Sequence, residues 1–238
     1  MRTFREALAQ AAPRPDDLAR APDKKNYAER LSRCLATVFA NLLRNDFAGI
    51  TPGPLGERQE ALARTSKGVK KLDVNYSTPE LGLGLGLSIK TLNYRDADTN
   101  RYTKNFTRID NELRAEAVDY HERQPWSVLV ALIFLPVDAC DDYKRGESSS
   151  SFGQAVRVFR HRASREAPTD RTQLFERVYV GLYALDDADP WDVRFFDVMQ
   201  TPPRAGRPSE AVTIENVIAE IIRIYDARNA PPFEWAGE

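Results

Sequence analysis

Apolar residues recur at helical spacing in three segments of the chain. In each segment they occupy every third or fourth position, which places them along one face of an α-helix. The three segments are 26–45, 105–122 and 213–228. Weaker periodicity predicts a short helix within the first 25 residues, a helix over 57–65 and a basic amphipathic helix over 151–164.

Four other segments have the composition of β-strands. Residues 70–78, 174–185 and 192–199 are rich in β-branched and aromatic side chains and are bounded by turn-forming residues. Residues 127–136 are almost entirely apolar, which is typical of a central strand that is buried on both faces. We therefore expect a sheet with this segment near its middle.

Leucine and glycine alternate in a fifth strand-like segment, LGLGLGLSIKTL, at 81–92. Strict alternation predicts one apolar face and one face of small or polar residues. The apolar face contains Leu81, Leu83, Leu85, Leu87 and Ile89, and the other contains Gly82, Gly84, Gly86, Ser88 and Lys90. Glycine is a poor strand former, so three on one face predict that another group approaches the backbone closely there. The alternative is a covered core strand, in which glycine makes room for a helix and the lysine extends outward.

The order of these elements predicts an α/β fold. A helix, two strands, a helix and a buried strand are followed by further strands and a helix. This order is typical of a mixed central sheet flanked by helices. The length of 238 residues suits a single domain over 1–238, with a core at about 26–136 and a C-terminal elaboration at about 150–230.

Composition narrows the classes of function. Two cysteines form no disulfide framework, so we expect a cytoplasmic protein, and two histidines make a histidine-rich zinc centre improbable on composition alone. The net charge of −1 means that any surface for nucleic acid must be local. The longest apolar run, which begins at Val128, is too short to span a bilayer, so we expect no membrane association.

Two neighbouring predicted strands each carry a polar side chain near one end. Asp73 lies in the first and Lys90 in the second, beside the glycine face. An acid and an amine in this arrangement suit metal-assisted hydrolysis of a phosphodiester. Asp73 would bind Mg²⁺, or Mn²⁺ as a substitute, and the ion would lower the pKa of a bound water. Lys90 would orient or deprotonate that water and stabilise the pentavalent state. The alternative for Asp73 is a strand-end residue bonded to a turn.

This pattern resembles the PD-(D/E)xK, or restriction-endonuclease-like, nucleases over roughly residues 26–136. Asp73 matches the metal-binding aspartate of the motif, although Leu72 stands where the motif has proline, and Lys90 matches the motif lysine. Ile89 matches the position whose backbone carbonyl binds metal. The resemblance implies a restriction-endonuclease-like core with C-terminal strand and helix additions.

Ser88 departs from the family pattern, because the family usually has Asp or Glu at this position. Some restriction enzymes of this superfamily carry Ser-x-Lys and take the missing carboxylate from the following helix. Glu112 and Glu116 are the candidates on that helix, with Glu116 nearer to the apolar stripe. The alternative for both is a solvated helix face that pairs with Arg108. The Ser88 hydroxyl is itself a candidate ligand.

Two further acids are candidates for the metal site. Family members often carry a glutamate on the first helix, and Glu29 is the acid best placed there. Glu80 follows Pro79 in a turn and is a weaker substitute.

Basic residues gather on both sides of the proposed site in sequence. Those expected to reach phosphates are Lys67, Lys70, Lys71, Arg101, Lys104 and Arg108. The arginine-rich segment 157–165 is a candidate surface for a protein partner. The alternative for each single residue is an ordinary solvated surface.

The leading hypothesis is a Mg²⁺-dependent endonuclease of a restriction or defence type that acts on DNA, expected to be duplex. Such an enzyme would work as a homodimer or beside a partner subunit. Two alternatives remain open. The first is a catalytically inactive nuclease fold that serves as an assembly subunit, which the loss of a motif carboxylate at Ser88 favours. The second is a nucleotide- or phosphate-binding module, which the glycine-rich run favours although it lacks the P-loop pattern.

Overall fold

The computed structural model describes residues 1–79, 82–186 and 188–229. Glu80 and Leu81 therefore lie outside the described residues. A five-stranded mixed sheet forms the centre of the molecule, with the strand order β3-β4-β5-β6-β7. The strands are β3 (Val74–Thr78), β4 (Gly82–Thr91), β5 (Val128–Pro136), β6 (Arg177–Tyr183) and β7 (Val193–Asp197). β4, β5 and β6 are parallel, and the two edge strands are antiparallel to their neighbours.

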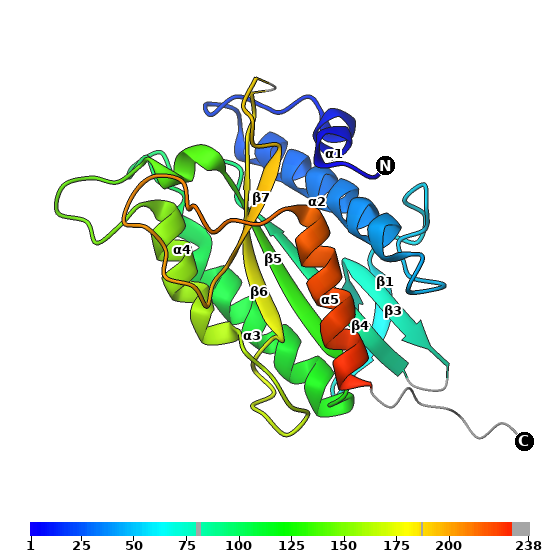
Figure 1. Cartoon of the computed structure of the whole chain (residues 1–238). Coiled ribbons are helices and arrows are strands. Elements are labelled where there is room, and N and C mark those ends of the chain that lie inside the picture. Colours follow the sequence, from blue (N-terminus) through cyan, green and yellow to red (C-terminus); the bar gives the residue numbers. More distant parts are fainter. Residues whose placement is uncertain (80–81, 187, 230–238) are drawn as a thin grey trace, which may run out of the picture.

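Helices cover both faces of this sheet (Figure 1). One face packs against α1 (Phe4–Ala11), α2 (Ala21–Leu43) and α5 (Ile214–Arg228). The opposite face packs against α3 (Phe106–Arg123) and α4 (Ser151–Phe159). Short 3₁₀ turns occur at Thr103–Asn105, Val137–Cys140 and Arg160–Arg162. Two hydrophobic clusters result, and the sheet separates them.

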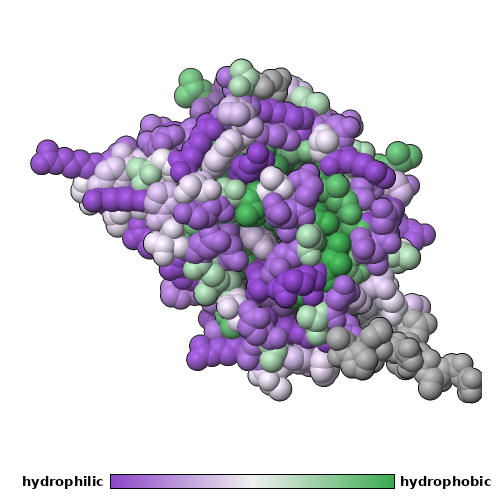
Figure 2. Space-filling model, in the orientation of Figure 1, coloured by the Kyte–Doolittle hydropathy of each residue, from purple (hydrophilic) through white to green (hydrophobic). Residues whose placement is uncertain are grey.

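The predicted mixed α/β class is confirmed, and so is the position of the apolar strand. β5 lies in the middle of the sheet with every residue buried, because both of its faces are covered by helices. The three strongly periodic segments form α2, α3 and α5. Figure 2 shows a mainly hydrophilic surface on the side of α2 and α5, with a narrow apolar strip beside α5. No helix among the described residues has the length and apolar character needed to cross a membrane.

The segment 57–65 is not a helix, so that prediction was wrong. Ala61–Thr65 forms β1, which pairs with β2 (Gly68–Leu72) as an antiparallel hairpin. Gly68 has a φ of +127°, which a residue with a side chain rarely adopts, and it follows the tight turn of the hairpin. The hairpin is held on α3, where the Ser66 N–H donates to the backbone carbonyl of Asp119 at 2.9 Å. Tertiary contact thus overrides a weak helical pattern.

The segment 70–78 was predicted as one strand but forms two. The chain bends at Asp73, and β2 before it belongs to the hairpin whereas β3 after it belongs to the central sheet. Leu72 packs into the cluster on the α3 side, and Val74 packs into the cluster on the α2 side. The bend therefore moves the chain from one layer to the other.

The alternation along β4 is interrupted by a β-bulge. Tyr76 pairs with Leu85 and Ser77 pairs with Leu83, so Gly84 has no partner in the register. Leu83 consequently lies in the cluster on the α3 side, whereas Leu85, Leu87 and Ile89 lie on the α2 side. The prediction of one continuous leucine face is therefore wrong at Leu83.

Gly84 and Gly86 of β4 are packed rather than open to a ligand, whereas Gly82 at the start of the strand lines a pocket. A methyl group at Gly84 would lie 3.2 Å from the Tyr225 hydroxyl, and one at Gly86 would lie 2.9 Å from side-chain atoms of Leu72 and Leu129. The hairpin and α5 therefore fill the space that the missing side chains leave. The expected close approach to the backbone occurs, but core side chains make it.

A buried ionic cluster joins the ends of α3 and α5 to the sheet. Glu176 accepts hydrogen bonds from Arg165 at 3.0 Å, from Arg228 at 2.9 Å and from the Leu129 N–H at 2.7 Å. His121 Nε2 lies 3.5 Å from the same carboxylate. The Glu176 side chain is fully buried, and two arginines offset the cost of burying its charge.

Candidate functional site

The bend at residue 73 positions the aspartate of the candidate site. β3 pairs with β4 only as far as Val74 opposite Leu87, so the Ile89 N–H lies beyond the end of the ladder. The Asp73 carboxylate takes the place of the missing strand and accepts this N–H at 2.6 Å. Asp73 is thereby held beside the segment of β4 that contains Ser88 and Lys90. The alternative for Asp73 was a strand-end residue bonded to a turn. The structure bears out part of it, because Asp73 accepts a backbone N–H, but this N–H belongs to the adjacent strand.

Glu116 of α3 lies against the two polar side chains of β4. Its Oε2 accepts the Ser88 hydroxyl at 2.6 Å, and its Oε1 accepts the Lys90 ammonium at 2.7 Å. Ser88 is buried, and the side chains of Lys90 and Glu116 are 19% and 23% exposed, so solvent reaches the pair. The expectation that the helix after the motif brings a carboxylate beside Ser88 is met by Glu116.

Glu112 lies one turn earlier on α3 and is more loosely attached. Its carboxylate is 3.8 Å from the Lys90 ammonium, and it forms an ion pair with Arg108. Arg108 is therefore drawn to the site through Glu112 rather than left free for a phosphate. The ion pair between Arg108 and Glu112 is the pairing along the helix surface that was given as the alternative to a metal-binding role for Glu112.

Burial and neighbouring charges shift the pKa values of Asp73 and Lys90. Burial raises the pKa of Asp73 to about 6, helped by Glu116 and Glu60 and opposed by the Ile89 N–H and by Lys90. Burial by itself would lower the pKa of Lys90, but Glu116, Asp73 and Glu112 together hold it above its ordinary value. Lys90 is thus protonated at neutral pH, and Asp73 is close to titration.

The donors around Asp73 match the chemistry of Mg²⁺. Asp73 and Glu116 supply carboxylate oxygens, and the carbonyl of Ile89 points to the same side of β4 as the N–H that Asp73 accepts. Among residues 1–79, 82–186 and 188–229, no group of three His, Cys, Asp or Glu side chains is arranged to hold a metal. Mg²⁺ is commonly bound by one or two carboxylates together with water and substrate phosphate, and these donors fit that mode.

Glu29 does not belong to this site, so its predicted role as a ligand is wrong. It lies on α2, which packs on the face of the sheet opposite to α3. Its side chain is 51% exposed and lies 3.6 Å from Lys25. Glu80, the other substitute acid, falls outside the described residues.

Most of the residues expected to contact phosphates have acidic partners. Lys67 lies 3.1 Å from Asp119, and Lys70 pairs with the same carboxylate. Lys71 pairs with Glu60 at 2.7 Å, and Lys104 pairs with Asp96 at 2.6 Å. All four lysines remain solvent-accessible, with side-chain exposures of 41–72%. They can still meet a polyanion, but they do not form an uncompensated positive surface.

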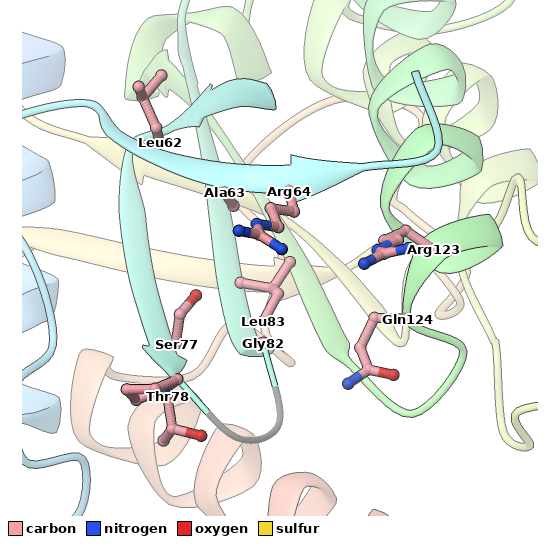
Figure 3. Close-up of a pocket in the computed structure, with 10 residues that line it drawn as sticks. Leu62, Ala63, Arg64, Ser77, Thr78, Gly82, Leu83, Arg123 and Gln124 are labelled. Atoms are coloured by element: carbon pink, nitrogen blue, oxygen red, sulfur yellow. The ribbon is translucent and has the colours of Figure 1, made fainter. Parts of the chain in front are cut away.

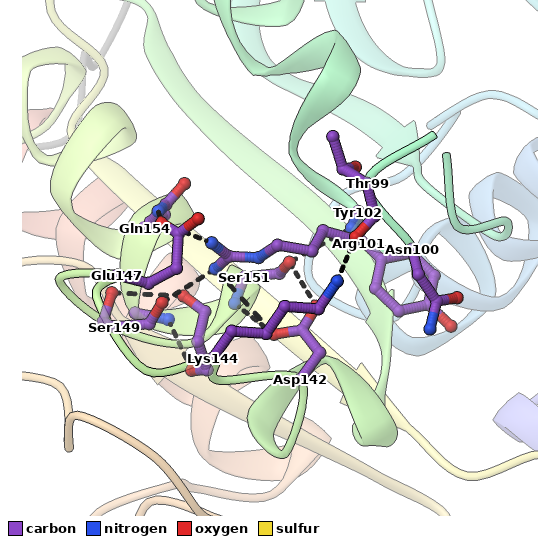
Figure 4. A network of polar contacts seen from close by, with 12 residues as sticks. Thr99, Asn100, Arg101, Tyr102, Asp142, Lys144, Glu147, Ser149, Ser151 and Gln154 are labelled. Atoms are coloured by element: carbon purple, nitrogen blue, oxygen red, sulfur yellow. Dashed lines mark hydrogen bonds and ion pairs between the residues drawn. The ribbon is translucent and has the colours of Figure 1, made fainter. Parts of the chain in front are cut away.

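Arg101 has a structural role, which corrects its predicted contact with phosphate. It is 4% exposed, and it donates to the Ser149 carbonyl at 2.7 Å and pairs with Glu147 at 2.8 Å. Figure 4 shows its side chain crossing the loop before α4, with Asp142 nearby. Such a buried guanidinium organises the loop and cannot reach a polynucleotide.

The arginine-rich segment 157–165 is likewise bound within the fold. Arg160 donates to the Val198 carbonyl at 2.8 Å, Arg162 pairs with Asp110 at 2.6 Å, and Arg165 belongs to the buried ionic cluster. These contacts explain the density of arginines without a protein partner.

Sequence reasoning missed a pocket of about 500 Å³ at the other end of β4 (Figure 3). Arg64 of the hairpin and Arg123 at the end of α3 both line it. The pocket was missed because 57–65 was expected to be a helix. The sequence signal that could have revealed the hairpin is Gly68 directly after Ser66 and Lys67, which form the two-residue turn between the strands.

Comparison with known protein families, with curated proteins and with solved structures finds no match to this chain. The resemblance to restriction-endonuclease-like nucleases therefore stays a prediction from the motif residues.

Proposed function

We propose that this protein is a metal-dependent nuclease that hydrolyses phosphodiester bonds of DNA, with its active site at Asp73, Lys90 and Glu116. The observation that carries the proposal is the joint position of these groups. A carboxylate from the bend before β3 and a carboxylate from α3 meet the end of β4, where the motif lysine is located. The second carboxylate replaces the one that Ser88 lacks.

The raised pKa of Asp73 supports a cation at this place. Burial is the main cause of the raised pKa, and the nearby Glu116 adds to it, so ionisation of Asp73 is unfavourable. A divalent ion would offset both effects by attracting the carboxylate charge, and perturbed groups of this kind are typical of functional sites. Asp73 and Glu116 would hold Mg²⁺ or Mn²⁺, together with the Ile89 carbonyl.

Each residue then has a defined part in the reaction. Bound Mg²⁺ would supply an acidified water and neutralise charge on the phosphate. Lys90, which Glu116 keeps protonated, donates a hydrogen bond to a phosphate oxygen and stabilises the negative charge of the pentavalent state. It is a poor general base at neutral pH for the same reason. The Ser88 hydroxyl orients Glu116, which makes it a positioning residue.

A cleavage assay tests the proposal. Plasmid, linear duplex and single-stranded DNA are incubated with Mg²⁺, with Mn²⁺ and with a chelator. We expect chelator-sensitive cutting that falls at least about a hundredfold in Asp73→Asn, Lys90→Met and Glu116→Gln. Glu29→Gln is the matched control, because Glu29 is exposed and lies outside the site, and it should cut at the wild-type rate. Cutting that persists in Asp73→Asn, or in the presence of the chelator, contradicts the assignment.

A second function is favoured by one observation. Both oxygens of Glu116 are occupied by Ser88 and Lys90, so the motif lysine and its carboxylate satisfy each other. An inactive nuclease fold retained as an assembly subunit would have this arrangement. Absence of cutting on every substrate, together with no binding of Mn²⁺ by calorimetry, would favour that function.

The proposed setting follows from the same observations. Both cysteines, Cys34 and Cys140, are free, which suits a reducing cytoplasm. Duplex DNA is the proposed substrate, and its two strands could be cut by a homodimer or with a partner subunit of a restriction or defence system. Sedimentation of the protein with and without a duplex would measure this stoichiometry.

A further inference from the structure

The pocket of about 500 Å³ beneath the β1–β2 hairpin is separate from the proposed active site. It lies at the start of β4, whereas Lys90 lies near the end of this ten-residue strand. Its walls come from the hairpin, from β3, from the beginning of β4 and from the C-terminal end of α3. Its size is within the range of about 300–1,000 Å³ that small-molecule sites occupy.

Two arginines face this pocket from different elements. Figure 3 shows the guanidinium groups of Arg64 and Arg123 extending toward the same opening. Both residues are exposed, and neither side chain forms an ion pair with a described residue. This sets them apart from Lys67, Lys70 and Lys71 of the same hairpin, each of which has an acidic partner.

The local charge favours an anion. Among the described residues that line the pocket, the two charged side chains are Arg64 and Arg123, and both are positive. Arginine is the side chain best suited to phosphate, because its planar fork donates two parallel hydrogen bonds.

The rest of the lining suits a larger body attached to that anion. Leu62 and Leu83 line the pocket, and Leu62 is 63% exposed, which leaves apolar surface available for contact. The Ser77 hydroxyl donates to Asn75 at 2.6 Å, so its oxygen is oriented and can still accept a hydrogen bond. A charged group on one side and apolar contact on the other match a nucleotide.

We propose that this pocket binds a phosphate monoester on a nucleotide-sized body, with Arg64 and Arg123 holding the phosphate. The ligand can be a free mononucleotide or the 5′-phosphorylated end of an oligonucleotide, which share this chemistry. The inference is independent of the nuclease proposal, because the pocket uses none of Asp73, Lys90 and Glu116.

Binding assays without divalent metal test this site. The probes are inorganic phosphate, AMP and two single-stranded hexanucleotides of one sequence, with a 5′-phosphate or a 5′-hydroxyl. Calorimetry should show that the 5′-phosphorylated oligonucleotide binds at least about tenfold tighter than the hydroxyl form, and that AMP competes with it. AMP binding that the oligonucleotide cannot displace would identify the free nucleotide as the ligand.

Substitutions assign the binding to the pocket. In Arg64→Gln/Arg123→Gln, affinity for the phosphorylated probe should fall about tenfold to a hundredfold, because charge-assisted hydrogen bonds are lost. Arg145→Gln is the matched control, since Arg145 is exposed on a distant loop and should leave affinity unchanged. Asp73→Asn should also bind normally, so failure of the nuclease proposal would not affect this result.

A chemical measurement on the wild-type protein complements the variants. AMP should protect Arg64 and Arg123 from phenylglyoxal, as read by mass spectrometry, and should leave Arg145 reactive. Equal binding of the hydroxyl and phosphorylated oligonucleotides, or wild-type affinity in the double variant, would overturn the proposal. Absence of protection at both arginines would overturn it as well.

Discussion

Replacing Asp73 with asparagine should stabilise the protein at neutral pH in the absence of metal. The native pKa of this carboxyl is raised to about 6 from an ordinary value of 3.8, mainly by burial. The native state therefore binds a proton more tightly than the unfolded chain does. Stability from this group is fully present below about pH 4 and is lost as pH rises through about 6. Asparagine has no charge to bury, and its Oδ1 can still accept the Ile89 N–H.

The size of the effect follows from the shift. A change of about two pKa units corresponds to about 3 kcal/mol at 1.36 kcal/mol per unit. Part of the Asp73 surface is accessible to solvent, so water reduces the cost of its charge below this figure. We therefore expect Asp73→Asn to raise the free energy of unfolding by about 1–3 kcal/mol at pH 8. Below about pH 4 the wild-type carboxyl is protonated in both states, and the difference should vanish.

Urea unfolding followed by circular dichroism between pH 4 and pH 8 measures this difference. The same titrations with Mg²⁺ test the proposed site, because an ion bound only by the native state stabilises it by about 2.7 kcal/mol at a hundred times its dissociation constant. Mg²⁺ should stabilise the wild type and leave Asp73→Asn unchanged. Asp46→Asn is the control, since Asp46 is exposed and lies far along the sequence from the motif residues.

Two results would refute the reasoning. If Asp73→Asn is less stable than the wild type at pH 8, then Asp73 serves as a structural cap for the Ile89 N–H and its charge is not destabilising. If Mg²⁺ stabilises both proteins equally, the ion binds elsewhere.

Three further substitutions test the packing and the ion pairs. Glu176→Gln should lower the free energy of unfolding by about 3–5 kcal/mol in urea, because it leaves two buried arginines without a counter-charge; a loss below about 1 kcal/mol would mean that water solvates the cluster. Gly86→Ala should lower the free energy of unfolding by about 1–3 kcal/mol in the same assay, because its methyl group would lie 2.9 Å from two leucine side chains. An unchanged unfolding midpoint would show that the hairpin can move away. Lys104→Gln should change stability by less than about 1 kcal/mol, because Lys104 is 67% exposed and Asp96 keeps hydrogen bonds from the Asp98 and Thr99 N–H groups, and a larger loss in thermal unfolding would argue against this.

The hydrophobic pattern was sufficient for the elements that bury one long apolar face. α2, α3 and α5 were predicted from their periodicity, and β5 from its continuous apolar composition, because these signals are local and repeat over many residues. The sequence also placed Asp73 and Lys90 on neighbouring strands at one site, and it named Glu112 and Glu116 as the two candidates for the substitute carboxylate. In these cases strand order and helix spacing constrain where a side chain can lie.

Other features depend on contacts between distant segments. The hairpin of β1 and β2 forms because it packs on α3, and its own residues carry only a weak helical pattern. The β-bulge at Gly84 moves the Leu83 side chain to the opposite face of the sheet, and the strict alternation in the sequence could not reveal this. The sequence predicts a surface position for Arg101, because it lies in a polar connection. It is buried because the loop before α4 folds around it.

The sequence by itself thus determined which segments are helices and strands of the core and that Asp73 and Lys90 both lie near the end of β4. Tertiary structure alone decided which acid joins them, which basic residues are neutralised by neighbours, and where Arg64 and Arg123 face a common pocket. The physical reason is that hydrophobic periodicity is a property of neighbouring positions along the chain, whereas charge pairing and cavities arise between elements whose separation depends on the packing of the whole sheet.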